Sequence, residues 1–214
     1  MTTFGTSAYL KLLALNPQPR DTEIRNRIWS TRGNPYDFHK AMRRTATAFA
    51  AGIDDWPSTR AKLKSIRKPA ERISATAAVF ALKRWVNDRP IRLLRGNERK
   101  IASPNEIFSV KFSPDFEIDL DGVLTQVHIW NTKKPTLRLR EAIGMLGLFC
   151  ASETPSSIAV VSLRTSELFL PTNYESARDL ARILAIDVER RFTRIAEERR
   201  ERRPRPPEER RAGR

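Results

Sequence analysis

Acidic side chains, a histidine and a tryptophan recur at alternate positions in residues 112–135. Successive side chains of a β-strand point to opposite faces, so residues two apart share a face. One face of the predicted hairpin therefore carries Asp115, Glu117, Asp119, Gln126, His128 and Trp130. Two lysines, Lys133 and Lys134, follow directly. Carboxylates, an imidazole and ammonium groups so close together predict a functional site, and the alternative is an ordinary hairpin with one face in solvent.

The register of this hairpin is predicted from its turn. Asp121 and Gly122 both tolerate positive φ, as a two-residue type I′ turn requires. With these two residues as the loop, Asp115 lies opposite His128, and Trp130 lies one step along on the same face. The other face is apolar, with Phe116, Ile118, Leu120, Val123, Val127 and Ile129. The hairpin is therefore predicted to be amphipathic.

Other kinds of site have less support. The two histidines, His39 and His128, lack the spacing of a zinc site, and none of the 8 glycines forms a phosphate-binding loop motif. Cys150 is the single cysteine, which excludes an intramolecular disulfide. Its apolar neighbours predict a buried thiol, and a Cys150–His128 nucleophile pair has no local support.

Charge is distributed unevenly along the 214 residues, whose net charge is +15. Residues 1–112 carry 22 Lys or Arg against 9 Asp or Glu, whereas residues 113–188 carry 7 against 10. A basic half beside an acidic centre is typical of a polyanion-binding protein. Solubility is the alternative reason for such charge.

The first half of the chain reads as a series of helices, at about residues 6–15, 21–30, 35–51, 54–68 and 69–87. The basic residues that we expect to contact phosphates are Arg43, Arg44, Arg60, Lys62, Lys64, Arg67 and Lys68. A solvated helix face is the alternative reading of this run. In the helix at 69–87, the expected core stripe is Ile73, Ala77, Phe80, Ala81 and Trp85.

From residue 105 the pattern changes to that of strands. A strand at 107–112 precedes the hairpin, a helix at 136–151 follows it, and an apolar strand at 157–163 comes next. Gly144 and Gly147 predict that the helix packs closely onto a sheet. The last helix, 174–200, has Leu180, Ile183, Leu184, Val188 and Phe192 as its apolar stripe. Residues 201–214 are rich in Arg and Pro and are expected to be disordered.

The order strand–strand–strand–helix–strand resembles the PD-(D/E)xK nuclease superfamily, especially its RecB-type and restriction-endonuclease-like branches. Pro114-Asp115 and the later strand VHIWNTKK, residues 127–134, carry the resemblance. Asp115 takes the first acidic position of the family motif. His128 stands at the second acidic position and Trp130 at the lysine position, so the motif is degenerate.

The resemblance implies a metal-dependent chemistry that these residues match in part. In the family, two carboxylates hold Mg²⁺, which lowers the pKa of the attacking water, and the lysine helps activate it. Glu117 or Asp119 is a candidate for the second carboxylate, and Lys133 or Lys134 for the lysine. Glu141 lies near a position where RecB-type members often carry glutamine.

The sequence thus predicts an α/β protein of the α+β type, with a helical N-terminal part on a small mixed sheet and a long C-terminal helix. The predicted parts are a basic helical region (1–104), a nuclease-like core (105–200) and a tail (201–214). The predicted function is binding of nucleic acid, DNA rather than RNA, by a nuclease-like fold with an inactive site, in a recombination, mobile-element or defence system. The alternatives are an active nuclease that uses Mg²⁺ or Mn²⁺ at Asp115, and a protein-interaction module. Lys11 interrupts the first apolar stretch and no run is long enough for a membrane span, so we expect a cytoplasmic protein.

Overall fold

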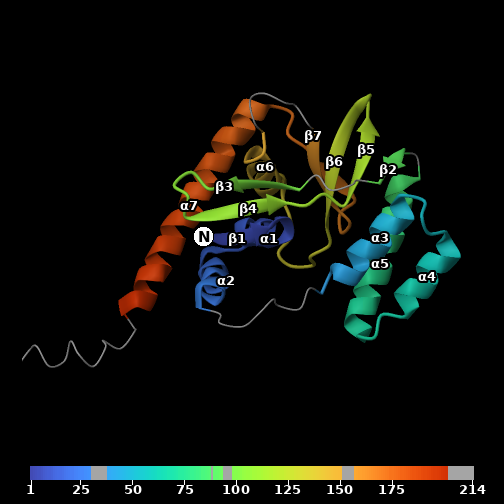
Figure 1. The fold of residues 1–214 in the computed structure, drawn as a ribbon, viewed down its shortest axis with the longest axis horizontal. Coiled ribbons are helices and arrows are strands. Elements are labelled where there is room, and N and C mark those ends of the chain that lie inside the picture. The colour runs from blue at the N-terminus through green and yellow to red at the C-terminus, as the bar shows by residue number, and fades with distance from the viewer. Residues whose placement is uncertain (30–37, 88, 94–97, 151–156, 202–214) are drawn as a thin grey trace, which may run out of the picture.

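The computed structural model of the chain describes residues 1–29, 38–87, 89–93, 98–150 and 157–201. It has the α+β architecture that the sequence predicts (Figure 1). The helices are α1 Thr6–Ala14, α2 Pro17–Trp29, α3 Lys40–Ala50, α4 Trp56–Lys64, α5 Pro69–Val86, α6 Leu139–Gly147 and α7 Tyr174–Glu201. The strands are β1 Thr2–Gly5, β2 Ile91–Arg92, β3 Arg99–Ala102, β4 Phe108–Phe112, β5 Phe116–Leu120, β6 Val123–Trp130, β7 Ser157–Ser162 and β8 Glu167–Phe169.

The described strands form two sheets. The larger has the order β2-β5-β6-β7-β8, with β5 and β6 antiparallel and β6 and β7 parallel. Helix α6 makes the crossover that a parallel pair requires. The smaller sheet has the order β1-β4-β3, and β1 runs parallel to β4. Strand β1 was not predicted, and it brings residues 2–5 into one sheet with residues 108–112.

The larger sheet is covered on both faces. Phe116, Ile118, Val127 and Ile129 pack against α3, α4 and α5. On the opposite face, Trp130 lies in a second core with β1, β4, α1, α6 and α7. The expectation of a half-solvated hairpin is therefore wrong for β6, which is buried on both faces from Thr125 onward. The smaller sheet supplies the cover that the sequence pattern of the hairpin did not reveal.

Helix α5 buries only part of the predicted stripe, since Ala81 and Trp85 are buried as expected. Ile73 is 69% exposed and Phe80 is 45% exposed, although both belong to the expected core stripe. The apolar residues that α5 buries are Ala75, Ala78, Val79, Ala81, Leu82 and Trp85. Apolar residues surround most of this helix, so periodicity alone could not select the buried side.

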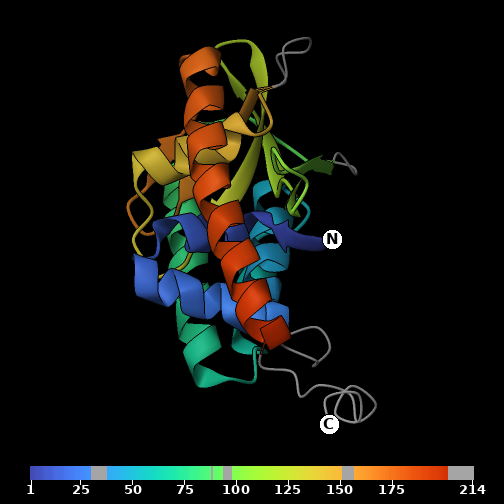
Figure 2. The same cartoon turned by 90° about the vertical axis from the view of Figure 1, so that its left-hand side faces the viewer.

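Helices α6 and α7 pack against each other (Figure 2). Gly144 and Gly147 face α7, and a Cβ added at Gly147 would lie 2.0 Å from the carbonyl oxygen of Ala177. The glycine pair therefore allows close contact between two helices, not packing onto a sheet. Ile183 of α7 was expected in the core but is 62% exposed.

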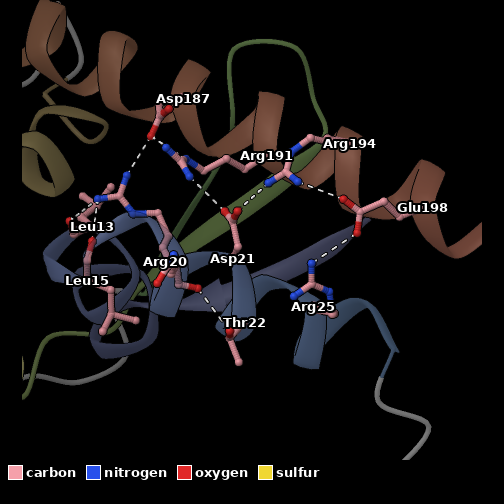
Figure 3. A network of polar contacts seen from close by, with 11 residues as sticks. Leu13, Leu15, Arg20, Asp21, Thr22, Arg25, Asp187, Arg191, Arg194 and Glu198 are labelled. Carbon is pink, nitrogen blue, oxygen red and sulfur yellow. Dashed lines mark hydrogen bonds and ion pairs between the residues drawn. The ribbon is translucent and has the colours of Figure 1, made fainter.

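A network of ion pairs joins α2 to α7 (Figure 3). Arg20 donates to Asp187 at 2.7 Å, and Asp21 accepts from Arg191 at 3.0 Å and from Arg194 at 2.5 Å. Partial burial alone would raise the pKa of Asp21, but the two arginines outweigh it and lower that pKa below 3.8. The network therefore anchors the N-terminal helices to the long C-terminal helix.

Two expectations fall wholly or partly on residues outside the described part of the chain. The start of the helix predicted at 35–51 lies there, and the described helix begins at Lys40. The disordered tail predicted from residue 201 also lies there, except for Glu201 at the end of α7. Among the described helices, none combines the length and the apolar character needed to cross a membrane.

Candidate functional site

The β5–β6 hairpin has the predicted turn and register. Asp121 and Gly122 have φ values of 51° and 83°, as the type I′ turn requires. The backbone N–H of Asp115 donates to the carbonyl of Val127 at 2.8 Å, just before β5 begins. The Asp115 carboxylate Oδ2 then lies 3.1 Å from Nδ1 of His128. The prediction that Asp115 faces His128 is confirmed.

Hydrogen bonds hold both of these side chains in place. Oδ2 of Asp115 also accepts from the backbone N–H of Ile129 at 2.7 Å. Nδ1 of His128 lies 2.9 Å from the carbonyl oxygen of Ser113, and its Nε2 lies 2.7 Å from Oγ of Ser7. His128 is 2% exposed, and the Asp115 side chain is 10% exposed. Both nitrogens of the buried imidazole therefore have a partner within the protein.

Ser7 is the hydrogen-bond partner of His128 that sequence reasoning did not single out. It is the second residue of α1, and its Oγ also accepts from Nη1 of Arg43 on α3 at 3.1 Å. The N-cap residue of α1 is Gly5. Ser7 lies 121 positions from His128, and no local pattern links them.

Trp130 is a core residue. It lies on the same face as His128, as predicted, but it is 1% exposed and belongs to the core cluster that includes Phe112, Leu146 and Val160. Its indole is therefore not available to stack on a base. The position that resembles the family's lysine is occupied by an apolar anchor of the fold.

The other acidic residues of the hairpin do not converge with Asp115. Oδ1 of Asp119 accepts from the N–H of Gly122 in the turn at 2.7 Å. Glu117 pairs in register with Arg92 on β2. Within the described ranges, no group of three or more His, Cys, Asp or Glu side chains could hold a metal ion. The carboxylates predicted as partners of Asp115, Glu117 and Asp119, therefore do not complete with it the two-carboxylate Mg²⁺ or Mn²⁺ centre that the resemblance implies.

The predicted substitutes for the missing lysine also lie elsewhere. Lys133 and Lys134 are exposed in the loop that follows β6, and Glu141 lies in the first turn of α6. None of the three lines either of the clefts that contain Asp115.

Asp115 lies where two open clefts adjoin, with volumes of about 930 Å³ and 1230 Å³. The smaller is lined by Arg43, Arg44, Lys62, Arg67 and Lys68. The larger shares Arg43 and Arg44 and adds Arg27, Lys40 and Lys111. The acidic side chains that line them are Glu71, Glu98 and Asp115. We call the two clefts together the basic cleft, because eight basic residues line it against three acidic ones.

The basic cleft contains five of the seven basic residues that the sequence singled out. Arg60 and Lys64 are exposed on α4 but do not line it. Lys62 lines it while its Nζ binds the carboxylate of Asp54 at 2.6 Å. Arg43 of α3 donates to Ser7, which is the hydrogen-bond partner of His128 on the hairpin.

Comparison with known proteins assigns no family. No protein-family model matches the chain, and no curated protein sequence matches it.

Proposed function

We propose that the protein binds nucleic acid, DNA in the first place, in the basic cleft. The observation that carries this proposal is the excess of cationic side chains in one concave region, eight against three. A concave surface lined by one sign of charge concentrates the field and attracts a polyanion. Arginines such as Arg43 and Arg44 suit this role because a guanidinium can bind a phosphate with two parallel hydrogen bonds.

The same arrangement predicts how the protein binds. Contacts to phosphates release condensed counterions and carry no information about base sequence. Affinity should therefore be salt-dependent and tolerant of sequence. Trp130 is buried, so its indole cannot stack on a base. The cleft offers charged and hydrogen-bonding side chains to the ligand instead.

The resemblance to PD-(D/E)xK nucleases supports DNA as the ligand. An antiparallel hairpin, a helical crossover and a parallel strand follow one another as β5, β6, α6 and β7. Asp115 keeps the first acidic position of the motif, at the edge of the basic cleft. The proposal is a nuclease-like fold that binds DNA without the family's metal centre.

The test is a binding titration with paired charge reversals. Arg44 and Arg67 line the cleft, whereas Arg60 and Lys64 are exposed outside it. Fluorescence anisotropy of a labelled duplex across a salt series should show a steep loss of affinity for the wild type. Arg44→Glu with Arg67→Glu should weaken binding at least about tenfold and make the salt slope shallower by about 2, since each phosphate contact contributes roughly 0.9.

The control pair, Arg60→Glu with Lys64→Glu, changes the net charge by the same amount. It should leave the salt slope close to that of the wild type. Equal effects of the two pairs would overturn the assignment of the cleft, and binding that ignores salt would overturn nucleic acid as the ligand. In the latter case, capture of an acidic protein that survives nuclease treatment would favour the protein-interaction alternative.

The metal-dependent alternative has its own test. Incubation of supercoiled plasmid with the protein and Mn²⁺ should give no nicking that depends on the metal. Nicking that requires Mn²⁺ and disappears in Asp115→Ala would show that Asp115 recruits ligands that the described residues do not bring together.

A further inference from the structure

We propose that Ser7 is a nucleophile activated by His128, and that it attacks phosphodiesters bound in the basic cleft without a metal ion. Ser7, His128 and Asp115 all line the larger cleft. The distances are 2.7 Å from Ser7 Oγ to His128 Nε2 and 3.1 Å from His128 Nδ1 to Asp115 Oδ2. A hydroxyl, a base within hydrogen-bond reach and a third group that orients the base are the parts of an activated serine.

The partners of His128 determine which ring nitrogen carries the proton. Nδ1 lies 2.9 Å from the carbonyl oxygen of Ser113, which can only accept a hydrogen bond. Nδ1 must therefore be the protonated nitrogen. In the neutral ring Nε2 is then an acceptor, so the hydroxyl of Ser7 donates to it. This is the tautomer in which His128 can act as a general base toward Ser7.

Arg43 determines the direction of the other hydrogen bond at Ser7. Its Nη1 can only donate, so Oγ of Ser7 accepts at 3.1 Å while its own hydrogen points to His128. The hydrogen bonds thus run in one direction, from Arg43 to Ser7 to His128. A guanidinium at this distance stabilises negative charge as it develops on Oγ and on the oxygens of an attacked phosphate.

Asp115 is a positioning residue in this arrangement. Its Oδ2 is fixed by the N–H of Ile129 at 2.7 Å and faces Nδ1 of His128. A carboxylate there holds the ring and stabilises the imidazolium that forms when His128 takes a proton. The deep burial of His128, at 2% exposed, keeps the ring from rotating away.

The class of substrate rests on the proposed function. A cleft with this excess of cations favours a phosphodiester over an uncharged ester. In the first step, His128 takes the Ser7 proton, Oγ forms a bond to phosphorus, and the bond to one ester oxygen breaks. His128 then returns the proton to that oxygen, which leaves as an alcohol. Attack by water on the phosphoryl-serine, again with His128 as base, releases a phosphomonoester and restores Ser7.

The alternative role for these contacts is structural, because they also tie α1 and α3 to the hairpin. A purely structural serine would lower stability when removed but would never carry a phosphoryl group. The test must therefore detect the covalent species, and it must use a probe that does not need the whole cleft.

The probe is bis(p-nitrophenyl) phosphate, incubated with the full chain in EDTA. The wild type should release p-nitrophenol, and mass spectrometry of the quenched protein should find the aryl phosphate on Ser7. Ser7→Ala should abolish both signals while keeping the circular-dichroism spectrum of the wild type. The matched control is Ser176→Ala, an exposed serine in the first turn of α7, which should react like the wild type.

Variants of the partner residues separate their roles. His128→Gln should lower the rate by about 10²–10⁴-fold, the usual contribution of a general base. Asp115→Asn should lower kcat at least about tenfold without raising KM, since Asp115 acts through His128.

Release that persists in Ser7→Ala, or no release by a wild type that binds DNA, would overturn the nucleophile. Turnover of p-nitrophenyl acetate but not of the phosphodiester would overturn the substrate class. A wild type that forms the Ser7 adduct but does not bind DNA would contradict the proposed function alone.

Discussion

The contact between α6 and α7 gives a quantitative test of the packing. A Cβ at Gly147 would lie 2.0 Å from the carbonyl oxygen of Ala177 and 2.5 Å from its carbonyl carbon. An ordinary carbon–oxygen contact is about 3.3 Å or more, so Gly147→Ala requires the two helices to separate locally by roughly 1.3 Å. The obstacle is backbone, which cannot move away by changing a rotamer.

Gly144 provides the matched comparison on the same helix. A Cβ there would meet Cδ1 of Leu184 at 2.3 Å, which is the end of a flexible side chain. Overpacking costs about 1–3 kcal/mol of stability, whereas replacing Gly by Ala inside a helix stabilises the helix by about 1 kcal/mol. We expect Gly147→Ala to lower the free energy of unfolding by up to about 2 kcal/mol, which is the upper overpacking cost less that gain. Gly144→Ala should change it by at most about 1 kcal/mol.

Urea denaturation followed by circular dichroism measures both variants against the wild type. The helices should remain in Gly147→Ala at low urea, with the midpoint shifted to lower concentration. A Gly147→Ala variant as stable as the wild type, or less affected than Gly144→Ala, would refute the close approach of α6 to Ala177.

Two further predictions concern the ion network and the motif. Burial alone would raise the pKa of Asp21, but Arg191 and Arg194 lower it in the folded state. The ionised carboxylate therefore stabilises the fold fully above its ordinary pKa of 3.8, and this stabilisation is lost as the pH falls through the folded-state pKa. Urea unfolding should therefore show Asp21→Asn less stable than the wild type at pH 7, with the difference shrinking as the pH falls below 3.8, and a constant difference would contradict this. Trp130→Lys, which restores the family's lysine, should cost about 3–5 kcal/mol because it removes a core indole and buries a charge, and a thermal melt equal to that of the wild type would contradict the packing.

Local sequence rules were sufficient for the hairpin and for most elements. Asp121 and Gly122 specify the turn because few residue types adopt positive φ, and the turn then sets every pair along the ladder. The same register correctly placed Asp115 opposite His128. Pro69 likewise marks the start of α5, where a missing backbone N–H carries no penalty.

Local rules failed where several faces of an element are apolar. Ile73 and Phe80 have the spacing of a core stripe, but Ala75, Val79 and Leu82 have it too. The elements that pack against a helix decide which of its faces is buried. Helix α5 packs against β5, β6 and β7 through Ala75, Val79 and Leu82. Gly144 and Gly147 signalled close packing correctly, yet their partner was a helix 30 or more positions away in the chain.

The sequence by itself therefore determined the register of the hairpin, the acid–histidine pair and the basic character of the helices. Only the tertiary structure decided what surrounds that pair. Ser7 reaches His128, and Arg43 reaches Ser7, from two helices that are distant in the sequence, because β1 and α1 pack beside β4 and α3 packs against the other core of the sheet. Contacts between distant segments depend on the burial of whole surfaces, and local periodicity carries no record of them.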